Sequence, residues 1–400
     1  MVNIRKVTED TWWVGASDRR LALFENAFPI PRGVSYNAYV IMDEKTALLD
    51  TADASVSEQF LENLQGVLGE RSLDYLVVNH MEPDHCAVIG EVLLRYPKTV
   101  VVGNAKTFTM IGQFFGELPE ERKLAVKEGD ALSLGAHELT FVLAPMVHWP
   151  EAMFSYDKKT KALFSADAFG TFGALNGQIF ADEVEFERDW LDDARRYYTN
   201  IVGKYGNNVQ AVLKKAAAIE LEMLLPLHGP IWRKDLAWFL DKYQKWSTYE
   251  AEEKGAVILY ASMYGHTASL ADAFAGRLSE EGVKHIAVYD VSATDVSELI
   301  AEIFRYNTLV FASVSYNAGI HPKMEALLSD MKALSVQKKS VAVMENGTWA
   351  PSAKKCILSA MEGMKEMTIL EPSITVKSTF KKEQEADLDA LVKAVASAAK

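Results

Sequence analysis

The spacing of apolar and polar residues divides the chain into two parts with different rhythms. In the first part, short apolar runs alternate with turns and amphipathic stretches, which predicts short strands mixed with helices. Residues 38–42 and 46–50 flank a polar turn and predict a hairpin, and residues 54–69 predict an amphipathic helix. Further strands are predicted at residues 73–78, 138–144 and 161–166, before a mainly helical pattern from about residue 189 to 251.

The second part begins after a polar, charged stretch at residues 243–255. Continuous apolar runs predict strands at residues 256–260, 285–290, 308–313 and 340–345, with helices near 295–304, after Pro322, near 352–362 and near 383–398. Runs without polar alternation are typical of strands that are buried on both faces, so we expect a doubly wound parallel sheet. The boundary between two domains is predicted near residues 250–255.

Composition limits the class of protein, its partners and its location, but it does not identify the chemistry. The 400 residues are 49% hydrophobic and 24% charged, which is ordinary for a globular protein with a full core. The formal net charge of −13 argues against nucleic acid or an anionic membrane as the main partner. No apolar run predicts a signal peptide or a membrane span, and two distant cysteines do not support a disulfide framework. A reducing cytoplasm is therefore the expected location.

Two histidines and two carboxylates cluster in the stretch VVNHMEPDHCAV, residues 77–88. The preceding apolar strand ends near Val78, and Pro83 prevents its continuation, so we expect the cluster on a loop. A lone histidine in such a loop is more often an ordinary solvated side chain, but four potential ligands within one turn favour a metal site. The four candidates are His80, Glu82, Asp84 and His85.

Three more candidate ligands occur later in the first part of the chain. His148, Asp167 and His228 each stand where an apolar strand gives way to a loop. Singly, a histidine in that position is more typical of a structural residue than of a ligand. Together with the cluster at residues 80–85, these placements indicate a metal site assembled from several strand ends.

A loop that could hold a phosphate follows the strand at residues 256–260. Its Ser-x-x-Gly-x-Thr pattern, from Ser262 to Thr267, opens a helix, where backbone N–H groups and hydroxyls can bind an anion. A simple helix N-cap by Thr267 is an equally good interpretation of this loop alone. The Gly-Lys-Ser/Thr ending of a Walker motif is missing.

Two further loops, residues 313–319 and 345–351, follow strands at the same predicted sheet edge, where open α/β sheets bind ligands. The three loops together resemble flavodoxin, although the middle one differs from the common Ser-Pro-Thr type. The resemblance implies FMN, with its phosphate in the first loop and its ring against Tyr316 and Trp349. The residues expected to contact it are Ser262, Met263, Tyr264, Gly265, His266, Thr267, Ser313, Val314, Ser315, Tyr316, Asn317, Ala318, Gly319, Glu345, Asn346, Gly347, Thr348 and Trp349.

The metal motifs also resemble a known family. The order HMEPDH, HWPE, DAFG and HGP is similar to the binuclear sites of the metallo-β-lactamase superfamily, with Glu82 where the hydrolases carry histidine. A glutamate at this position is what flavodiiron proteins (A-type flavoproteins) show, and a mixed imidazole–carboxylate set suits iron better than zinc. The resemblance implies an α/β chain with a metallo-β-lactamase-like αββα sandwich at residues 1–250 and a flavodoxin-like domain at residues 255–400.

The same resemblance implies a set of ligands for two non-haem irons. His80, Glu82 and His148 would hold one iron and Asp84 and His228 the other, with Asp167 bridging. His85 matches a position that binds metal in some members and turns away in others. Tyr198 matches a substrate-side tyrosine, although a helical tyrosine is more typical of a core, and Trp349 would lie near the junction of flavin and irons.

Flavodiiron proteins reduce dioxygen to water, nitric oxide to nitrous oxide, or both, with electrons relayed from FMN. The resemblance implies a head-to-tail homodimer or a dimer of dimers. With two cysteines the chain is expected to carry no rubredoxin domain, so an external donor such as rubredoxin or a reduced deazaflavin is implied. One alternative is a binuclear zinc hydrolase such as a thioesterase or lactonase, which Glu82 and the flavin loops oppose. Another is an electron-transfer module with a degenerate metal site, which the complete ligand set opposes.

Overall fold

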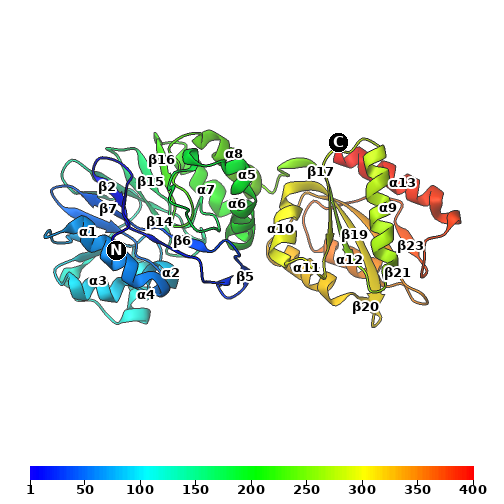
Figure 1. Ribbon diagram of the computed structural model, residues 1–400, viewed down its shortest axis with the longest axis horizontal. Coiled ribbons are helices and arrows are strands. Elements are labelled where there is room, and N and C mark those ends of the chain that lie inside the picture. Colours follow the sequence, from blue (N-terminus) through cyan, green and yellow to red (C-terminus); the bar gives the residue numbers. More distant parts are fainter. The chain divides into compact units, whose positions relative to one another are not determined.

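The computed structural model describes residues 1–400, which form two compact units, Met1–Tyr243 and Gln244–Lys400 (Figure 1). The first unit holds two β-sheets with helices around them, and the second holds one largely parallel sheet. The predicted fold class is confirmed: a metallo-β-lactamase-like sandwich precedes a flavodoxin-like sheet. The domain limits of 1–250 and 255–400 stay a prediction. None of the helices combines the length and apolarity that crossing a lipid bilayer requires.

The first sheet of the N-terminal unit is mixed, in the order β1-β2-β7-β8-β9-β10-β11. The predicted hairpin is confirmed as the antiparallel pair β7–β8, and β8, β9, β10 and β11 then run parallel. The strands are β1 (Arg5–Lys6), β2 (Thr11–Trp13), β7 (Tyr39–Met42), β8 (Thr46–Leu49), β9 (Tyr75–Val77), β10 (Val100–Gly103) and β11 (Lys123–Ala125).

The second sheet has the order β12-β13-β14-β15-β16 and is antiparallel except for its last pair, β15 with β16. Its strands are β12 (Ala131–Ser133), β13 (Glu138–Leu143), β14 (Met153–Asp157), β15 (Ala162–Phe164) and β16 (Met223–Leu225). Two short ribbons complete the unit: β3 (Ala16–Asp18) pairs with β6 (Val34–Tyr36), and β4 (Leu23–Phe24) with β5 (Phe28–Pro29).

Figure 1 shows α1 to α4 gathered beside the first sheet and α5 to α8 beside the second. The helices are α1 (Ser57–Leu68), α2 (Pro83–Cys86), α3 (Ile89–Arg95), α4 (Ala105–Phe115), α5 (Phe186–Asp189), α6 (Leu191–Tyr197), α7 (Gly206–Ala216) and α8 (Leu236–Ser247). A π-helical turn, Tyr198–Val202, continues α6. Asn104 caps α4 by accepting hydrogen bonds from the backbone N–H groups of Lys106 and Thr107, as expected for an N-cap asparagine.

The C-terminal unit has the sheet order β18-β17-β19-β21, with β22 and β23 both parallel to β21. Its strands are β17 (Glu253–Ala261), β18 (Ile286–Asp290), β19 (Tyr306–Tyr316), β20 (Gly319–Ile320), β21 (Ser340–Asn346), β22 (Thr368–Ile369) and β23 (Ile374–Val376). Its helices are α9 (His266–Glu280), α10 (Val296–Arg305), α11 (Pro322–Ala333), α12 (Ala353–Glu362) and α13 (Glu385–Ala399).

Alternate residues of each central strand in this unit pack on opposite faces, which explains the continuous apolar runs. Val257 and Leu259 of β17 belong to the core cluster that includes residues of α10, α11 and α12. Ala256 and Ile258 belong to the cluster formed with α9 and α13. Because both faces are covered by helices, a polar residue at either set of positions would lose solvation without a partner.

A buried histidine joins the ends of several strands in the N-terminal unit. His137, in the turn between β12 and β13, contacts Asp157 at the end of β14 through Nδ1 (2.9 Å) and Asp10 of the β1–β2 turn through Nε2 (3.2 Å). Burial lowers the pKa of His137, but Asp157 and Asp10 raise it more, so its net pKa lies above 6.5. The imidazolium therefore ties the second sheet to the edge of the first.

Asp157→Asn should destabilise the N-terminal unit, by about 1.5–3 kcal/mol, because a hydrogen bond to a charged group is lost. Since the folded-state pKa of His137 is raised, the stabilisation is fully present below about pH 6.5 and is lost as the pH rises through the raised value. Calorimetric unfolding of both proteins at pH 6 and pH 9 checks this. An equal deficit at both pH values would contradict a role for the charge on His137.

Candidate metal centre and cofactor cavity

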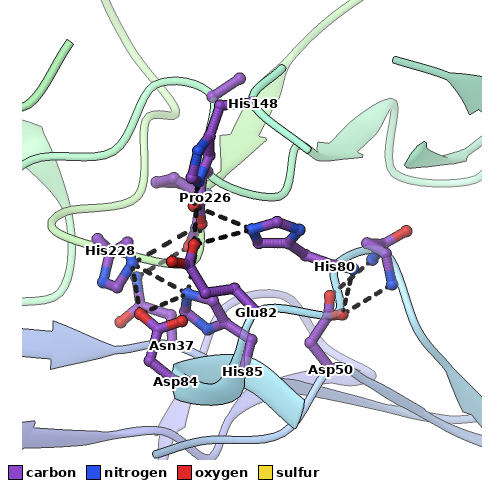
Figure 2. A network of polar contacts seen from close by, with 12 residues as sticks. Asn37, Asp50, His80, Glu82, Asp84, His85, His148, Pro226 and His228 are labelled. Atoms are coloured by element: carbon purple, nitrogen blue, oxygen red, sulfur yellow. Dashed lines mark hydrogen bonds and ion pairs between the residues drawn. The ribbon is translucent and has the colours of Figure 1, made fainter. Parts of the chain in front are cut away.

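The predicted metal ligands come from loops at the carboxyl ends of strands in both sheets. His80 follows β9, Asp167 follows β15, His228 follows β16, and His148 lies between β13 and β14. Because β8, β9 and β10 are parallel to one another, as are β15 and β16, each set of strand ends meets at one edge. Residues up to about 150 positions apart in sequence therefore reach a single site (Figure 2).

The cluster at residues 80–85 differs in one respect from the loop expected for it. Pro83 does not simply end the strand: it opens the one-turn helix α2, and Glu82 stands at the N-cap position. Proline is favoured in the first turn of a helix because the missing N–H has no intrahelical partner there. The short helix carries Asp84 and His85, whereas His80 and Glu82 lie on the loop before it.

The first group of ligand atoms comprises His80, Glu82, His148 and Asp167, all buried. Glu82 Oε2 lies 3.2 Å from His80 Nε2 and 3.0 Å from His148 Nε2. Asp167 Oδ2 lies 3.3 Å from the same atom of His80 and 3.0 Å from that of His148. Two imidazole nitrogens and two carboxylate oxygens thus face one small space, as a bound divalent cation would require.

The second group comprises Asp84, His85 and His228. Asp84 Oδ2 lies 3.2 Å from His85 Nε2 and 3.3 Å from His228 Nε2, and these two nitrogens are 2.9 Å apart. His85 is fully buried and points its Nε2 into the site, rather than away from it. Of the two orientations left open by the sequence, the structure has the inward one.

Asp167 lies between the two groups. Its Oδ2 faces the first group, and its Oδ1 lies 3.3 Å from His85 Nε2 and 3.7 Å from His228 Nε2. Several buried atoms here accept or donate no hydrogen bond: both carboxylate oxygens of Asp84, Oδ1 of Asp167 and Nδ1 of His85. Lone pairs left free in a buried site are what metal ions would satisfy, so the residues present fit two metals.

The charges of the cluster depend on one another. Burial raises the pKa of Glu82, but hydrogen bonds with His148 and His80 lower it to about 2. Burial lowers the pKa of His148, but Asp167 and Glu82 raise it to about 9. Burial also lowers the pKa of His85, but Asp84 and Asp167 raise it to about 10. Without metal, the carboxylates are therefore ionised and these imidazoles carry protons at neutral pH.

Groups behind the ligands fix their orientation. His228 donates from Nδ1 to the backbone carbonyl of Ser35 (2.8 Å), and the Asn37 side-chain amide donates to the carbonyls of Pro226 and Gly229 on either side. Asp50 accepts hydrogen bonds from the backbone N–H groups of Asn79 and His80. These contacts hold the loops before the metal binds, and the sequence had pointed to none of them.

Tyr197, and not the predicted Tyr198, has its ring against a ligand. The centroid of its ring lies 5.4 Å from that of His228, and its hydroxyl is buried without a hydrogen-bond partner. Burial and the charges of Asp167, Asp84 and Glu82 raise the pKa of Tyr197 far above 10, which keeps the hydroxyl protonated. Tyr198 packs against Tyr243, with ring centroids 5.0 Å apart.

The β4–β5 turn also reaches the site. Phe24 packs its ring edge-on to His228, with centroids 5.4 Å apart. The next residue, Glu25, lies near Glu82 but is exposed to solvent. Partial desolvation and the neighbouring charge of Glu82 raise the pKa of Glu25, at a position that sequence reasoning did not identify.

A separate cavity of about 290 Å³ lies at the carboxyl ends of the strands in the C-terminal unit. Its wall is built from the three predicted loops, including Ala350 of the third, and from Ser378; the predicted contact residues included neither Ala350 nor Ser378. Ser378 follows β23, a short strand absent from the predicted set, and its hydroxyl donates to Thr348. Tyr316 and Trp349 at the cavity are 42% and 89% exposed, so two aromatic faces are free to stack on a planar ring.

The first loop has the features of a phosphate site. Gly265 adopts a left-handed conformation (φ 89°) at the N-cap of α9, and its N–H donates to Ser262 Oγ. Thr267 is buried, and its hydroxyl has no hydrogen-bond partner. An anion at this helix N-terminus would satisfy that hydroxyl and the free backbone N–H groups, so the cavity fits FMN.

Four residues of the predicted cofactor set do not line this cavity: Gly265, Ser313, Gly319 and Glu345. Glu345 instead accepts hydrogen bonds from the backbone N–H of Lys354 and the hydroxyl of Thr375, so it ties α12 and β23 to β21. Gly319 pairs with Tyr316 in the β19–β20 ribbon. These residues shape the loops rather than the cavity wall.

The sequence matches two protein families, one for each unit. Residues 34–229 match the family described as ODP family beta lactamase, and residues 258–364 match flavodoxin. A nitric oxide reductase from Moorella thermoacetica is 32% identical over 374 residues, which cover 93% of this chain and 92% of that protein. An anaerobic nitric oxide reductase flavorubredoxin from Vibrio vulnificus is 31% identical over 86% of this chain and 70% of its own length.

Two solved structures have the same architecture across both units. The flavodiiron protein from Giardia intestinalis is 25% identical with a TM-score of 0.91, covering 99% of this chain and 96% of that one. The rubredoxin oxygen:oxidoreductase from Desulfovibrio gigas is 26% identical with a TM-score of 0.91, covering 99% and 98%. The two-unit architecture is therefore shared along nearly the full length.

Metal binding to the metal-free protein should release protons and become tighter as the pH rises. The raised pKa values of His148 and His85 mean that metal must displace protons from their imidazoles at pH 7. The apparent affinity should rise by about tenfold per pH unit for each proton released. Calorimetric titration with Zn²⁺ in buffers of different protonation enthalpy counts these protons. An affinity that is equal at pH 6 and pH 8 would contradict the assignment.

Proposed function

The chain belongs to the flavodiiron proteins, and from that membership we propose that it reduces nitric oxide to nitrous oxide, dioxygen to water, or both. The observation that carries the proposal is Asp167, which turns one oxygen to each of two ligand groups, one of which contains Glu82. A buried carboxylate between two ligand groups suits a pair of metals, and a second carboxylate within the set suits iron.

We assign the ligands as two sets that share Asp167. His80, Glu82 and His148 would hold one iron, and Asp84, His85 and His228 the other. The contacts within each group and the free lone pairs of Asp84 and Asp167 support this assignment. When bound, the two irons and the FMN supply the electrons, and the irons supply open coordination positions for a diatomic substrate.

The chain's own residues would hold the substrate site dry and supply a hydrogen-bond donor. Phe24, Tyr36 and Phe172 are buried around His228 or Tyr197, and such apolar rings restrict water. Both reductions consume protons, and the Tyr197 hydroxyl keeps its proton beside the three carboxylates. We propose that Tyr197 Oη keeps this proton and donates a hydrogen bond to the reacting oxygen.

The FMN would lie in the cavity of the C-terminal unit, with its phosphate at the N-terminus of α9. Ser262 and Thr267 offer hydroxyls to the phosphate, and Tyr316 and Trp349 offer faces to the ring. Backbone groups of the middle loop, residues 314–318, would contact the ring edge. The apolar rim of this cavity suits the isoalloxazine better than a purely polar cofactor.

An external electron donor and a dimer belong to the same proposal. The names of two relatives, flavorubredoxin and rubredoxin oxygen:oxidoreductase, support a rubredoxin-like donor, and a reduced deazaflavin is the other candidate.

We propose a head-to-tail homodimer, or a dimer of such dimers, in which the flavin of one subunit lies beside the irons of its partner. Sedimentation and the rate of flavin oxidation on dilution test the assembly, and an unchanged rate in the monomer would oppose it. The cytoplasm is the proposed location, on the grounds of cysteine usage.

The alternative function is that of a binuclear zinc hydrolase. Glu82 in the first group and a flavin cavity in the same chain both oppose it. Metal analysis separates the two cases, because a hydrolase would contain two zinc ions per chain and no yellow flavin.

The purified protein should be yellow, with about one FMN and two irons per chain, and its reduced form should be reoxidised rapidly by nitric oxide or by dioxygen. Stopped-flow mixing of the reduced protein with each gas in turn measures the rate and the preference. Asp167→Ala should lose iron and rapid reoxidation while it keeps FMN, because both ligand groups lose a shared oxygen. Rapid turnover in Asp167→Ala would contradict the bridging assignment.

Tyr197→Phe and Tyr198→Phe form a matched pair on adjacent residues. If Tyr197 donates this hydrogen bond, Tyr197→Phe should lower turnover by about 100-fold, with iron and FMN contents unchanged. Tyr198→Phe should lower turnover far less, because Tyr198 packs on Tyr243. Steady-state consumption of each gas measures both variants, and a larger loss in Tyr198→Phe would reverse the assignment.

A further inference from the structure

Glu151 is a buried carboxylate directly behind the ligand His80. It is 1% exposed, and its Oε1 accepts hydrogen bonds from His80 Nδ1 (2.9 Å) and from the backbone N–H of Met81 (2.8 Å). Its other oxygen, Oε2, has no hydrogen-bond partner. With the proton held on Nδ1, the Nε2 lone pair of His80 must point to Glu82 and Asp167, where the first metal would lie.

The histidines of the second ligand group are supported differently. His228 donates from Nδ1 to the carbonyl of Ser35, which is neutral. Nδ1 of His85 is buried and has no hydrogen-bond partner. In the first group, the Nδ1 atom of His80 therefore has a carboxylate as its partner. In the second group, the Nδ1 atom of His228 has a neutral carbonyl and that of His85 has no partner.

This difference has a consequence for metal binding. An anionic acceptor makes an imidazole a stronger donor to metal, and its charge stabilises the cation beyond the ring. The Asp167 carboxylate is shared by both groups, and each group has one further carboxylate of its own, Glu82 or Asp84. Among the partners of the imidazole Nδ1 atoms, Glu151 is therefore a carboxylate for which the second group has no counterpart.

We propose that Glu151 is a positioning residue that orients His80 and makes the metal position of His80, Glu82 and His148 the tighter of the two. The inference rests on the proposed di-metal site and adds that its two positions are unequal. Glu151 contacts neither metal nor substrate; it acts through His80 and through the loop at Met81.

Glutamine at position 151 separates charge from geometry. Glu151→Gln keeps an oxygen for the two donors and removes the charge, while the new amide replaces Oε2, which has no partner to lose. Glu151→Asp keeps the charge but shortens the reach to His80. Asp157→Asn is the matched control. It also removes a carboxylate that accepts a hydrogen bond from a histidine Nδ1 (His137, 2.9 Å), but Asp157 stands at the far end of β14 from Glu151 and contacts none of the proposed ligands.

The experiment is an anaerobic titration of the metal-free full chain with Fe²⁺ in competition with a chelator, which resolves two binding events. Glu151→Gln should weaken one event by about 10- to 100-fold and leave the other unchanged, and Glu151→Asp should weaken the same event by less. Asp157→Asn should bind both ions as the wild type does. In an Asp84→Asn background, where the second position is impaired, Glu151→Gln should weaken the remaining event.

Two outcomes would overturn the inference: equal affinities in wild type and Glu151→Gln, or equal weakening of both events. Circular dichroism and FMN content show whether each variant is folded, and if Glu151→Gln is not, the same selective loss in Glu151→Asp carries the test. Failure of the wild type to bind two ions would instead overturn the proposed function. The two failures are therefore distinguishable.

Discussion

The N-terminal unit brings three carboxylates and four imidazoles into one buried space, and the balance of their charges governs the rest of the site. Without cations between them, Glu82, Asp84 and Asp167 would repel one another, and each buried charge would lack a partner. In the metal-free protein the partners are the protons that His80, His85 and His148 retain, since the pKa values of these imidazoles are raised and those of the carboxylates are lowered. Metal ions would take the place of those protons without requiring the side chains to move far.

The scaffold makes this arrangement possible by placing the ligands where strands end. Asp50, at the end of β8, accepts hydrogen bonds from Asn79, and the Asn79 side chain in turn accepts one from Ser155 in the second sheet. This chain of contacts links the two sheets beneath the ligands, so the ligand loops start from fixed positions. The C-terminal unit repeats the principle: an apolar core on both faces of the sheet, and a cofactor cavity at its strand ends.

The structure also separates the roles of residues that look alike in sequence. The histidines of the site are all buried, yet His80 has a carboxylate behind it, His228 a carbonyl, and His85 nothing that accepts its Nδ1 proton. Glu25 and Glu82 are both glutamates, but one tends to hold a proton and the other to lose it. Such differences are how one small cluster can bind metals, tune them and retain protons beside them.

Local patterns in the sequence were enough to predict the β7–β8 hairpin, the central strands of the C-terminal sheet, most helices and the residues at strand ends, but not short strands such as β10, β14 and β23. The density of ligands at residues 80–85, the presence of Glu82 and the loop from Ser262 to Thr267 can all be recognised within a few positions. These features are local because apolar periodicity and turn chemistry act over short distances. They indicated both the two-part fold and the kind of cofactors, and the comparisons with relatives agree.

Only the tertiary structure decided which way particular side chains point and which distant groups meet. Tyr197, the last residue of α6, has its ring against His228, whereas Tyr198, the first residue of the π-helical turn, packs on Tyr243. His85 turns inward, where Asp167 and His228 from other segments and its neighbour Asp84 all lie within 3.3 Å of its Nε2. Glu151 meets His80 across 71 residues. Contacts of this kind depend on how separate segments pack, and no short stretch of sequence contains that information.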